Sequence, residues 1–370
     1  MNVLITTGLY PPEIGGPATY SKFLAEKLPS FGHRVSVLAF RDVRKYWPVI
    51  RHIVFFINVI RKGAKADVIY AQDTMSVGLP SACANIFLGK KFLVRVPGDH
   101  VWEQGTARFG ITEPLESFPV FSWSWHPYLI LLRMLQRFVI QTADALIVPS
   151  KYIERIVKTW TPNVKKVVLI YNGVEQLEDT GNKMVLRGLL RFQGKLIISV
   201  GRLVAWKGFS ELIALMPELK KQFPDLKLLI AGSGPSLSSL EEEAQSLGLQ
   251  NDVIFTGELE RDVLLRYMRI ADVFVLNSRY EGLSHLMLEV MTVGVPVVAT
   301  AVGGNPEVID HERNGYLIPA NDKEKMLLHV SALLRDANLR AHIVAAAKRK
   351  VKQFSNERMV EETVKLLKRI

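Results

Sequence analysis

The stretch from Ala271 to Thr300 constrains the fold of this chain more than any other part of the sequence. It reads ADVFVLNSRYEGLSHLMLEVMTVGVPVVAT, in which two apolar runs that predict buried parallel strands enclose a polar turn and one short helix. Ser284 is a good N-cap for that helix, and apolar side chains recur at helical spacing over residues 286–291. The turn from Asn277 to Leu283 therefore lies at the carboxyl end of a strand, which is the edge where open α/β sheets bind ligands.

Two glutamates, Glu281 and Glu289, fall in this loop and in the second turn of the helix, so that both can face one ligand. Backbone N–H groups and the positive end of the helix dipole meet at the loop and attract phosphate. The ordinary alternative is that Glu281 offsets the dipole and Glu289 is solvated. However, Glu289 lies between apolar neighbours, where a carboxylate needs partners such as the hydroxyl groups of a ligand.

The length of 370 residues is enough for two domains, each with its own core. Cys83 is the only cysteine and no Cys/His cluster has metal-ligand spacing, so we expect a cytosolic protein without disulfide or metal site. Met1–Thr6 leads directly into a strand, which is not the pattern of a signal peptide. No apolar run reaches the roughly 18 residues of a membrane span, so any association with the inner membrane surface would be peripheral.

The net charge of +11 is concentrated in the first half of the chain, because residues 1–175 hold 21 basic and 12 acidic side chains and therefore carry +9. Residues 44–65 are apolar and aromatic and are bracketed by basic residues, a composition typical of a helix at an anionic membrane surface. The alternative is a crossover helix packed on the sheet, with basic ends. A second aromatic stretch, Phe118–Val139, favours the membrane interpretation, and no nucleic-acid-binding motif accompanies the charge.

Two loops of the first half are candidate ligand contacts. Gly15 and Gly16 lie between a first strand and an amphipathic helix, where glycine lets a backbone approach a ligand, although a plain flexible turn explains them too. Asp99 and His100 follow the strand at residues 91–96 and are alternative candidates for an acid/base group. A linker at Glu175–Gly188 is expected to separate a first domain from a second.

The second half contains a strand at residues 196–200 that ends in Gly201 and is followed by Arg202 and Lys207. Two cations at the carboxyl end of a strand are suited to grip a diphosphate. A later strand ends in a turn with Gly232 and Gly234, but this turn lacks the full dinucleotide-binding fingerprint.

Several motifs occur together: Ser278–Leu283, the second glutamate eight positions after Glu281, then Gly294–Thr300 and Gly303–Glu307. This combination resembles family four of the retaining, nucleotide-sugar-dependent glycosyltransferases. The resemblance implies the α/β fold called GT-B, with two Rossmann-like doubly wound domains facing across a cleft. Residues 1–174 would form the acceptor-binding domain and residues 190–354 the donor-binding domain, with a last helix at 355–370 crossing back to the first.

The resemblance also implies roles for individual residues. Arg202 and Lys207 would bind the donor pyrophosphate, because the leaving diphosphate gains negative charge as the glycosidic bond breaks. Glu281 would hold sugar hydroxyls and Glu289 the ribose diol. Further contacts to the nucleotide-sugar donor are implied in the surrounding loops. They involve five glycines and one leucine, namely Gly201, Gly232, Gly234, Gly257, Gly282 and Leu283.

Family members place a histidine at the tip of the strand that here ends in Pro97-Gly98-Asp99-His100, so either Asp99 or His100 is implied to contact the transferred sugar. No Asp-x-Asp occurs in the chain, which agrees with transfer that needs neither metal nor cofactor. The implied acceptor is a glycan or a lipid-linked hydroxyl group. The motifs do not specify the nucleotide, the sugar, the acceptor or the oligomeric state.

Other functions fit parts of this pattern. A nucleotide-sugar epimerase shares the fold, whereas a phosphorylase would need a pyridoxal lysine and a longer chain. A catalytically silent sugar-nucleotide-binding module is the alternative outside the enzymes. The presence of Arg202, Lys207, Glu281 and Glu289 together favours a glycosyltransferase over the silent module.

Overall fold

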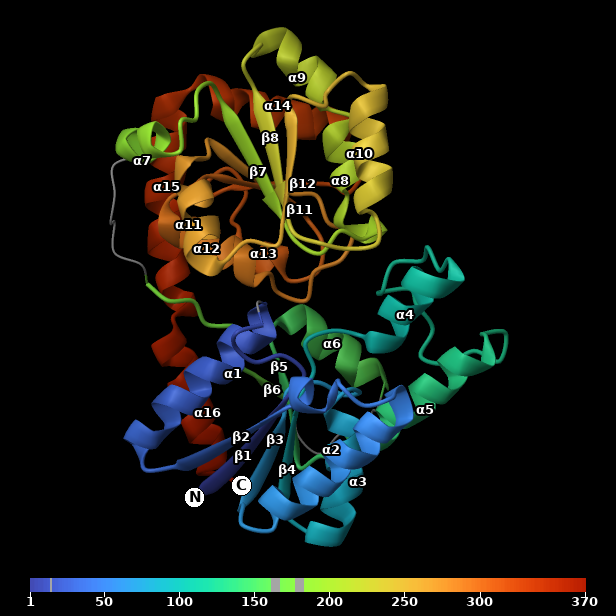
Figure 1. Cartoon of the computed structure of the whole chain (residues 1–370). Coiled ribbons are helices and arrows are strands. Elements are labelled where there is room, and N and C mark those ends of the chain that lie inside the picture. The colour runs from blue at the N-terminus through green and yellow to red at the C-terminus, as the bar shows by residue number, and fades with distance from the viewer. Residues whose placement is uncertain (14, 161–166, 177–182) are drawn as a thin grey trace. The chain divides into compact units, whose positions relative to one another are not determined.

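The computed structural model describes residues 1–13, 15–160, 167–176 and 183–370, which fall into two compact units (Figure 1). Unit 1 comprises Met1–Gly173 and Asn356–Ile370, and unit 2 comprises Val174–Ser355. Each unit is built on a six-stranded sheet with helices around it, and every strand pair within the two sheets is parallel, which confirms the predicted doubly wound α/β class. Among the described residues, no helix combines the length and the apolar character needed to span a bilayer.

The sheet of unit 1 has the order β2-β1-β3-β4-β5-β6. Its strands are β1 (Asn2–Thr7), β2 (Arg34–Ala39), β3 (Val68–Ala71), β4 (Lys91–Arg95), β5 (Ala145–Val148) and β6 (Val167–Leu169). The chain runs from β1 to β2 on one side and then returns to β3 on the other side of β1. The order therefore reverses between β1 and β3, and such a switch point is where doubly wound sheets bind ligands.

The described helices of unit 1 include the last helix of the chain. They are α1 (Gly16–Lys27), α2 (Pro48–Gly63), α3 (Gly78–Leu88), α4 (His100–Phe109), α5 (Pro127–Thr142), α6 (Lys151–Trp160) and α16 (Asn356–Leu367), with short 3-10 helices η1 (Leu28–Phe31) and η2 (Phe40–Val43). Met359 and Val364 of α16 share one buried cluster with Val3 of β1 and with Tyr20 and Leu24 of α1. The last helix is thus part of the core of unit 1.

Helix α2 occupies most of the apolar segment at residues 44–65. It buries Phe55, Val59 and Gly63, which are four residues apart and therefore lie on one side of the helix. A Cβ added at Gly63 would lie 2.7 Å from Leu88 Cδ1, so this side packs tightly on α3. On the other side, Ile53 and Ile57 are exposed. The helix therefore packs within unit 1, as the crossover-helix interpretation expects, and still presents apolar side chains outward, while the membrane interpretation stays a prediction.

The sheet of unit 2 has the order β12-β11-β10-β7-β8-β9. Its strands are β7 (Leu196–Val200), β8 (Lys227–Ala231), β9 (Val253–Gly257), β10 (Val273–Leu276), β11 (Val297–Thr300) and β12 (Tyr316–Ile318). The chain adds β8 and β9 on one side of β7 and then continues with β10 on the other side. The switch point of this sheet therefore lies between β7 and β10.

The described helices of unit 2 surround this sheet (Figure 1). They are α7 (Lys183–Leu189), α8 (Phe209–Ile213), α9 (Met216–Gln222), α10 (Leu237–Ser246), α11 (Arg261–Ile270), α12 (His285–Val293), α13 (Asn305–Val308), α14 (Lys323–Arg335) and α15 (Ala337–Val351), with 3-10 helices η3 (Ala205–Lys207) and η4 (Lys352–Phe354).

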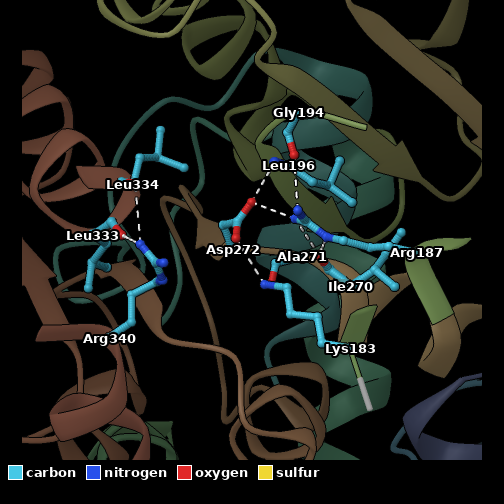
Figure 2. A network of polar contacts seen from close by, with 10 residues as sticks. All are labelled: Lys183, Arg187, Gly194, Leu196, Ile270, Ala271, Asp272, Leu333, Leu334 and Arg340. Atoms are coloured by element: carbon cyan, nitrogen blue, oxygen red, sulfur yellow. Dashed lines mark hydrogen bonds and ion pairs between the residues drawn. The ribbon is translucent and has the colours of Figure 1, made fainter. Parts of the chain in front are cut away.

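Helix α7 lies where the sequence predicted a linker. Figure 2 shows that the buried Asp272, just before β10, accepts hydrogen bonds from Lys183 Nζ at 2.9 Å and from Arg187 Nη2 at 2.7 Å. The same carboxylate accepts a third bond from the backbone N–H of Leu196 at 2.9 Å. The linker prediction is therefore wrong for residues 183–188, because both cations anchor a helix to the sheet. Residues 177–182 of the predicted linker lie outside the described residues.

A buried ion pair joins two helices of unit 1. Arg133 Nη2 of α5 lies 2.7 Å from Asp99 Oδ2, and neither side chain is exposed. Asp99 Oδ1 also accepts hydrogen bonds from the backbone N–H groups of Val101 and Trp102 and so caps α4. The guanidinium stacks near Trp160, with 5.1 Å between Cζ and the ring centroid. The pair fixes the start of α4 to α5.

We expect that Arg133→Met will lower the free energy of unfolding of unit 1 by about 3 kcal/mol, because the Asp99 carboxylate would remain buried without its cation. Urea unfolding followed by tryptophan fluorescence reports this change, since Trp125 and Trp160 lie close to Arg133. The double variant Asp99→Asn/Arg133→Met should lose less than the sum of the single variants. Arg137→Met on the same helix is the control, and strictly additive losses would contradict the role of the pair.

Candidate functional site

An ion pair bridges the switch point of the sheet in unit 2. Lys207 follows β7, Glu281 follows β10, and Lys207 Nζ lies 2.6 Å from Glu281 Oε1. Ser278 Oγ donates a second hydrogen bond, also of 2.6 Å, to the same oxygen. The structure thus brings together two residues that the sequence singled out and that are 74 positions apart. The sequence did not single out Ser278 as a site residue, although Ser278 begins the motif Ser278–Leu283.

Two glycines hold the backbone of Glu281 in place. A Cβ added at Gly303 would lie 1.8 Å from the carbonyl oxygen of Glu281, and one added at Gly304 would lie 2.3 Å from that of Gly282. Gly304 N–H also donates a 3.0 Å hydrogen bond to the carbonyl oxygen of Glu281. Because only glycine permits this close approach, the Gly-Gly pair after β11 supports the loop after β10.

The N-terminus of α12 lies directly after this loop. Ser284 Oγ accepts a 3.3 Å hydrogen bond from the backbone N–H of Met287, which confirms the predicted N-cap. The positive end of the helix dipole therefore lies beside residues 281–283, where it favours a negatively charged group. Gly282 and Leu283, both predicted donor contacts, belong to this segment.

The loop after β7 carries the other predicted cation. Arg202 has an exposed side chain, and no ion pair involves it among the residues that the structure describes. The methylene groups of Lys207 run past Gly201, because a Cβ added at that glycine would lie 3.9 Å from Lys207 Cδ and Cε. Lys207 thus passes Gly201 at ordinary contact distance and reaches Glu281, while no carboxylate of the described residues holds Arg202.

The remaining predicted glycines lie on neighbouring loops of the same sheet edge. A Cβ added at Gly232 would lie 2.0 Å from the carbonyl oxygen of Gly201, and one at Gly234 would lie 2.3 Å from that of Leu203. These two glycines let the loops after β7 and β8 pack backbone against backbone. Gly257 ends β9 with a φ of 66°, and a Cβ added there would have no neighbour within 4 Å.

Glu289 lies on α12 and is largely buried, with a side chain that is 16% exposed. Burial raises the pKa of its carboxyl group, and the positive charge of Arg261 opposes this effect. Arg261 Nε is 3.7 Å from Glu289 Oε1, while Arg261 Nη2 is 3.0 Å from Glu175 Oε2. The sequence pattern did not reveal Arg261, since nothing in its local neighbourhood distinguishes it from a surface arginine.

The switch point of unit 1 holds a second group of polar residues. Gly8 follows β1 and Asp73 follows β3, and a Cβ added at Gly8 would lie 3.1 Å from Asp73 Oδ2. His100 begins α4 after β4, and burial lowers its pKa although the nearby carboxylate of Asp73 acts in the opposite direction. Its imidazole is therefore neutral at neutral pH. Asp73 was not predicted from the sequence.

Asp99 and His100 were left as alternatives by the sequence, and their surroundings differ. The Asp99 carboxylate is buried and accepts hydrogen bonds from two backbone N–H groups and from Arg133. These protein groups occupy it in capping α4, so the geometry favours His100 as the residue that meets a ligand.

The glycine-rich loop before α1 is held by two arginines. Arg44 Nη2 donates a 3.1 Å hydrogen bond to the carbonyl oxygen of Gly8, and Arg44 Nη1 pairs with Glu13. Arg41 Nη1 donates to the carbonyl oxygen of Tyr10 at 3.3 Å. Gly15 caps the start of α1 and Gly16 is its first residue, whereas residue 14 lies outside the described residues. Arg44, one of the basic residues that bracket the apolar segment, thus also stabilises this loop.

Comparisons with known proteins agree with this architecture. The profile of the glycosyl transferases group 1 matches residues 189–350, and that of glycosyltransferase family 4 matches residues 14–176. An uncharacterized glycosyltransferase of Methanocaldococcus jannaschii is 30% identical over 100% of this chain and 98% of its own length. The alpha-monoglucosyldiacylglycerol synthase of Streptococcus pneumoniae is 27% identical over 83% of this chain and 72% of its own length.

The fold is also that of a solved structure that contains a nucleotide sugar. The crystal structure of Anabaena HepE in complex with UDP-glucose covers 100% of both chains with a TM-score of 0.79 at 19% identity. The fold and the sheet-edge site therefore define a GT-B enzyme. This chain belongs to the group 1 glycosyltransferases of the family four type, which transfer a sugar from a nucleotide-sugar donor.

We expect that Arg202→Ala and Lys207→Ala will each lower turnover about a hundredfold, because each loses a charge-assisted contact worth about 3 kcal/mol to the leaving diphosphate. Release of the nucleoside diphosphate measures the rate, and circular dichroism checks that each variant is folded. Lys221→Ala on the surface of the same unit is the control. Activity within a factor of about two of wild type in both variants would contradict the assigned role.

Proposed function

We propose that this chain is a retaining, metal-independent glycosyltransferase that acts on a glycan or lipid-linked acceptor at an anionic membrane surface. The observation that carries the catalytic part is the Lys207–Glu281 pair across the switch point of unit 2. The pair lies beside the N-terminus of α12 and on the same sheet edge as the exposed cation of Arg202. A site of this charge is suited to a diphosphate that leaves as the bond to the anomeric carbon breaks.

The pair also balances the charges of this site. Lys207 and Glu281 neutralise each other, so neither charge is buried alone. An incoming diphosphate draws Lys207 away, and the Glu281 carboxylate then accepts hydrogen bonds from sugar hydroxyls. We assign the ribose diol to Glu289, as the family resemblance implies. In unit 1, the neutral His100 is the candidate contact to the acceptor or the transferred sugar.

Metal independence is proposed because Arg202, Lys207 and the helix dipole supply positive charge where other transferases use a divalent ion. The chain has no Asp-x-Asp, the motif that would hold such an ion. No cofactor is proposed besides the donor itself.

A panel of nucleotide sugars, incubated with the enzyme in EDTA, tests the catalytic proposal. We expect one donor to release free nucleoside diphosphate at the same rate with and without EDTA, and NMR to show a product with the anomeric configuration of that donor. Loss of activity in EDTA that magnesium or manganese restores would contradict metal independence. An isomerised nucleotide sugar would indicate the epimerase alternative, and inverted product would contradict retention.

The membrane proposal rests on three helices of unit 1 that pack side by side and expose apolar side chains. Phe56 of α2 contacts Phe87 of α3, with ring centroids 6.1 Å apart, and α3 also packs on α5 (Figure 1). The exposed apolar residues of these helices and of the N-cap of α2, here called the apolar face, are Trp47, Val49, Ile50, Ile53, Ile57, Ile86, Phe87, Leu131 and Met134. Trp47 is 79% exposed and Phe87 is 75% exposed, which is unusual for side chains of this size.

Cations beside the apolar face fit an anionic lipid surface. Lys45, Arg61 and Lys65 are exposed at the two ends of α2, whereas Lys62 Nζ donates a 2.9 Å hydrogen bond to the carbonyl oxygen of Val37. Each free cation near an anionic leaflet contributes about 1 kcal/mol of binding. The S. pneumoniae relative is an alpha-monoglucosyldiacylglycerol synthase, which supports an acceptor of the lipid class for this chain.

Vesicle co-sedimentation tests this surface. We expect binding to vesicles that contain phosphatidylglycerol, weaker binding as salt rises, and little binding to pure phosphatidylcholine, because charge attraction is screened within a Debye length. Replacing Lys45, Arg61 and Lys65 by glutamate, or Ile53 and Ile57 by serine, should abolish sedimentation. Arg266, Arg349 and Lys352, exposed on unit 2, give a control triple variant with the same charge change. Equal recovery of wild type in the supernatant with both vesicle types would contradict the proposal.

A further inference from the structure

The carboxylate of Glu289 is largely buried, and among the described residues its one ion-pair contact is a long one. Its nearest cation is Arg261, whose Nε lies 3.7 Å from Glu289 Oε1, which is too long for a hydrogen bond. A buried carboxylate without donors is costly, and burial raises the pKa of this group. The Glu289 carboxylate therefore has the capacity to accept a shorter hydrogen bond from a ligand.

Arg261, beside Glu289, has an N–H donor without an acceptor in the described part of the chain. Its Nε is buried and has no hydrogen-bond partner among the described residues, although the guanidinium is anchored through Nη2 to Glu175 at 3.0 Å. The Arg261 side chain as a whole is 40% exposed, so the guanidinium can turn toward an incoming group with little loss of packing. An acceptor-only carboxylate and an orphaned N–H donor thus lie side by side at the start of α11 and on α12.

A hydroxyl group satisfies both, because it donates one hydrogen bond and accepts another. An oxygen placed about 2.8 Å from each atom fits a separation of 3.7 Å between them. We infer that Arg261 is a second ribose-binding residue, whose Nε–H donates to a hydroxyl of the donor ribose while that hydroxyl donates to Glu289. This inference rests on the proposed assignment of Glu289 to the ribose diol and extends it to a specificity-determining arginine held by Glu175.

The inference predicts discrimination between ribose and deoxyribose nucleotides. Isothermal titration calorimetry is carried out with UDP, GDP, ADP and CDP and with the 2′,3′-dideoxy form of whichever binds. Wild type should prefer the ribonucleotide about a hundredfold, since each lost hydrogen bond costs about tenfold in affinity. Arg261→Met should bind the ribonucleotide about tenfold more weakly and the dideoxy form unchanged, so that the preference falls to about tenfold.

Two further variants complete the experiment. Arg266→Met, an exposed arginine on the same helix, should behave as wild type with both ligands. Glu175→Gln, which loses the anchor of the guanidinium, should weaken ribonucleotide binding by a smaller factor than Arg261→Met.

The outcomes distinguish a failure of this inference from a failure of the proposed function. An equal loss for both ligands in Arg261→Met would mean a structural or general electrostatic role and would overturn the inference, as would no loss for either ligand. If wild type prefers the ribonucleotide and Arg261→Met keeps that preference, the inference fails while the nucleotide site stands. If wild type binds none of the four nucleoside diphosphates, the proposed function fails and the inference fails with it.

Discussion

The contact between Lys207 and Glu281 is the interaction on which the rest of the unit 2 site depends. It links the loop after β7 to the loop after β10, so it closes the sheet edge at the point where the strand order reverses. A largely buried ion pair adds little net stability, because desolvation of the charges offsets their attraction. The pair matters for geometry, since it fixes the side chains of Lys207 and Glu281 beside the N-terminus of α12.

The two units place different polar residues at the switch points of their sheets. In each sheet the loop after the first strand meets the loop after the strand that returns on its other side, as Gly8 meets Asp73 in unit 1 and Lys207 meets Glu281 in unit 2. The second unit offers cations and a helix dipole, which suit a diphosphate. The first offers a neutral imidazole at His100, which suits hydroxyl chemistry.

The sequence predicted those features whose signal is local. The strand at residues 273–276, the N-cap at Ser284 and the placing of Glu281 in a loop follow from period and capping within a few residues. The sequence did not predict ion pairs and hydrogen bonds between residues that are far apart in the chain. The ion pair of Asp99 with Arg133, 34 positions later, and the hydrogen bond from Lys183 to Asp272, 89 positions later, join residues whose local sequence does not reveal the partner.

The last helix has a consequence for the synthesis of the protein. Because α16 supplies Met359, Val360 and Val364 to the core around β1 and α1, unit 1 cannot close that core until the residues after Asn356 have left the ribosome. Unit 2, which is contiguous, has all its strands by Ile318. The domain that begins first is thus finished last, and the apolar side chains of β1 and α1 that pack on α16 stay uncovered in the interval.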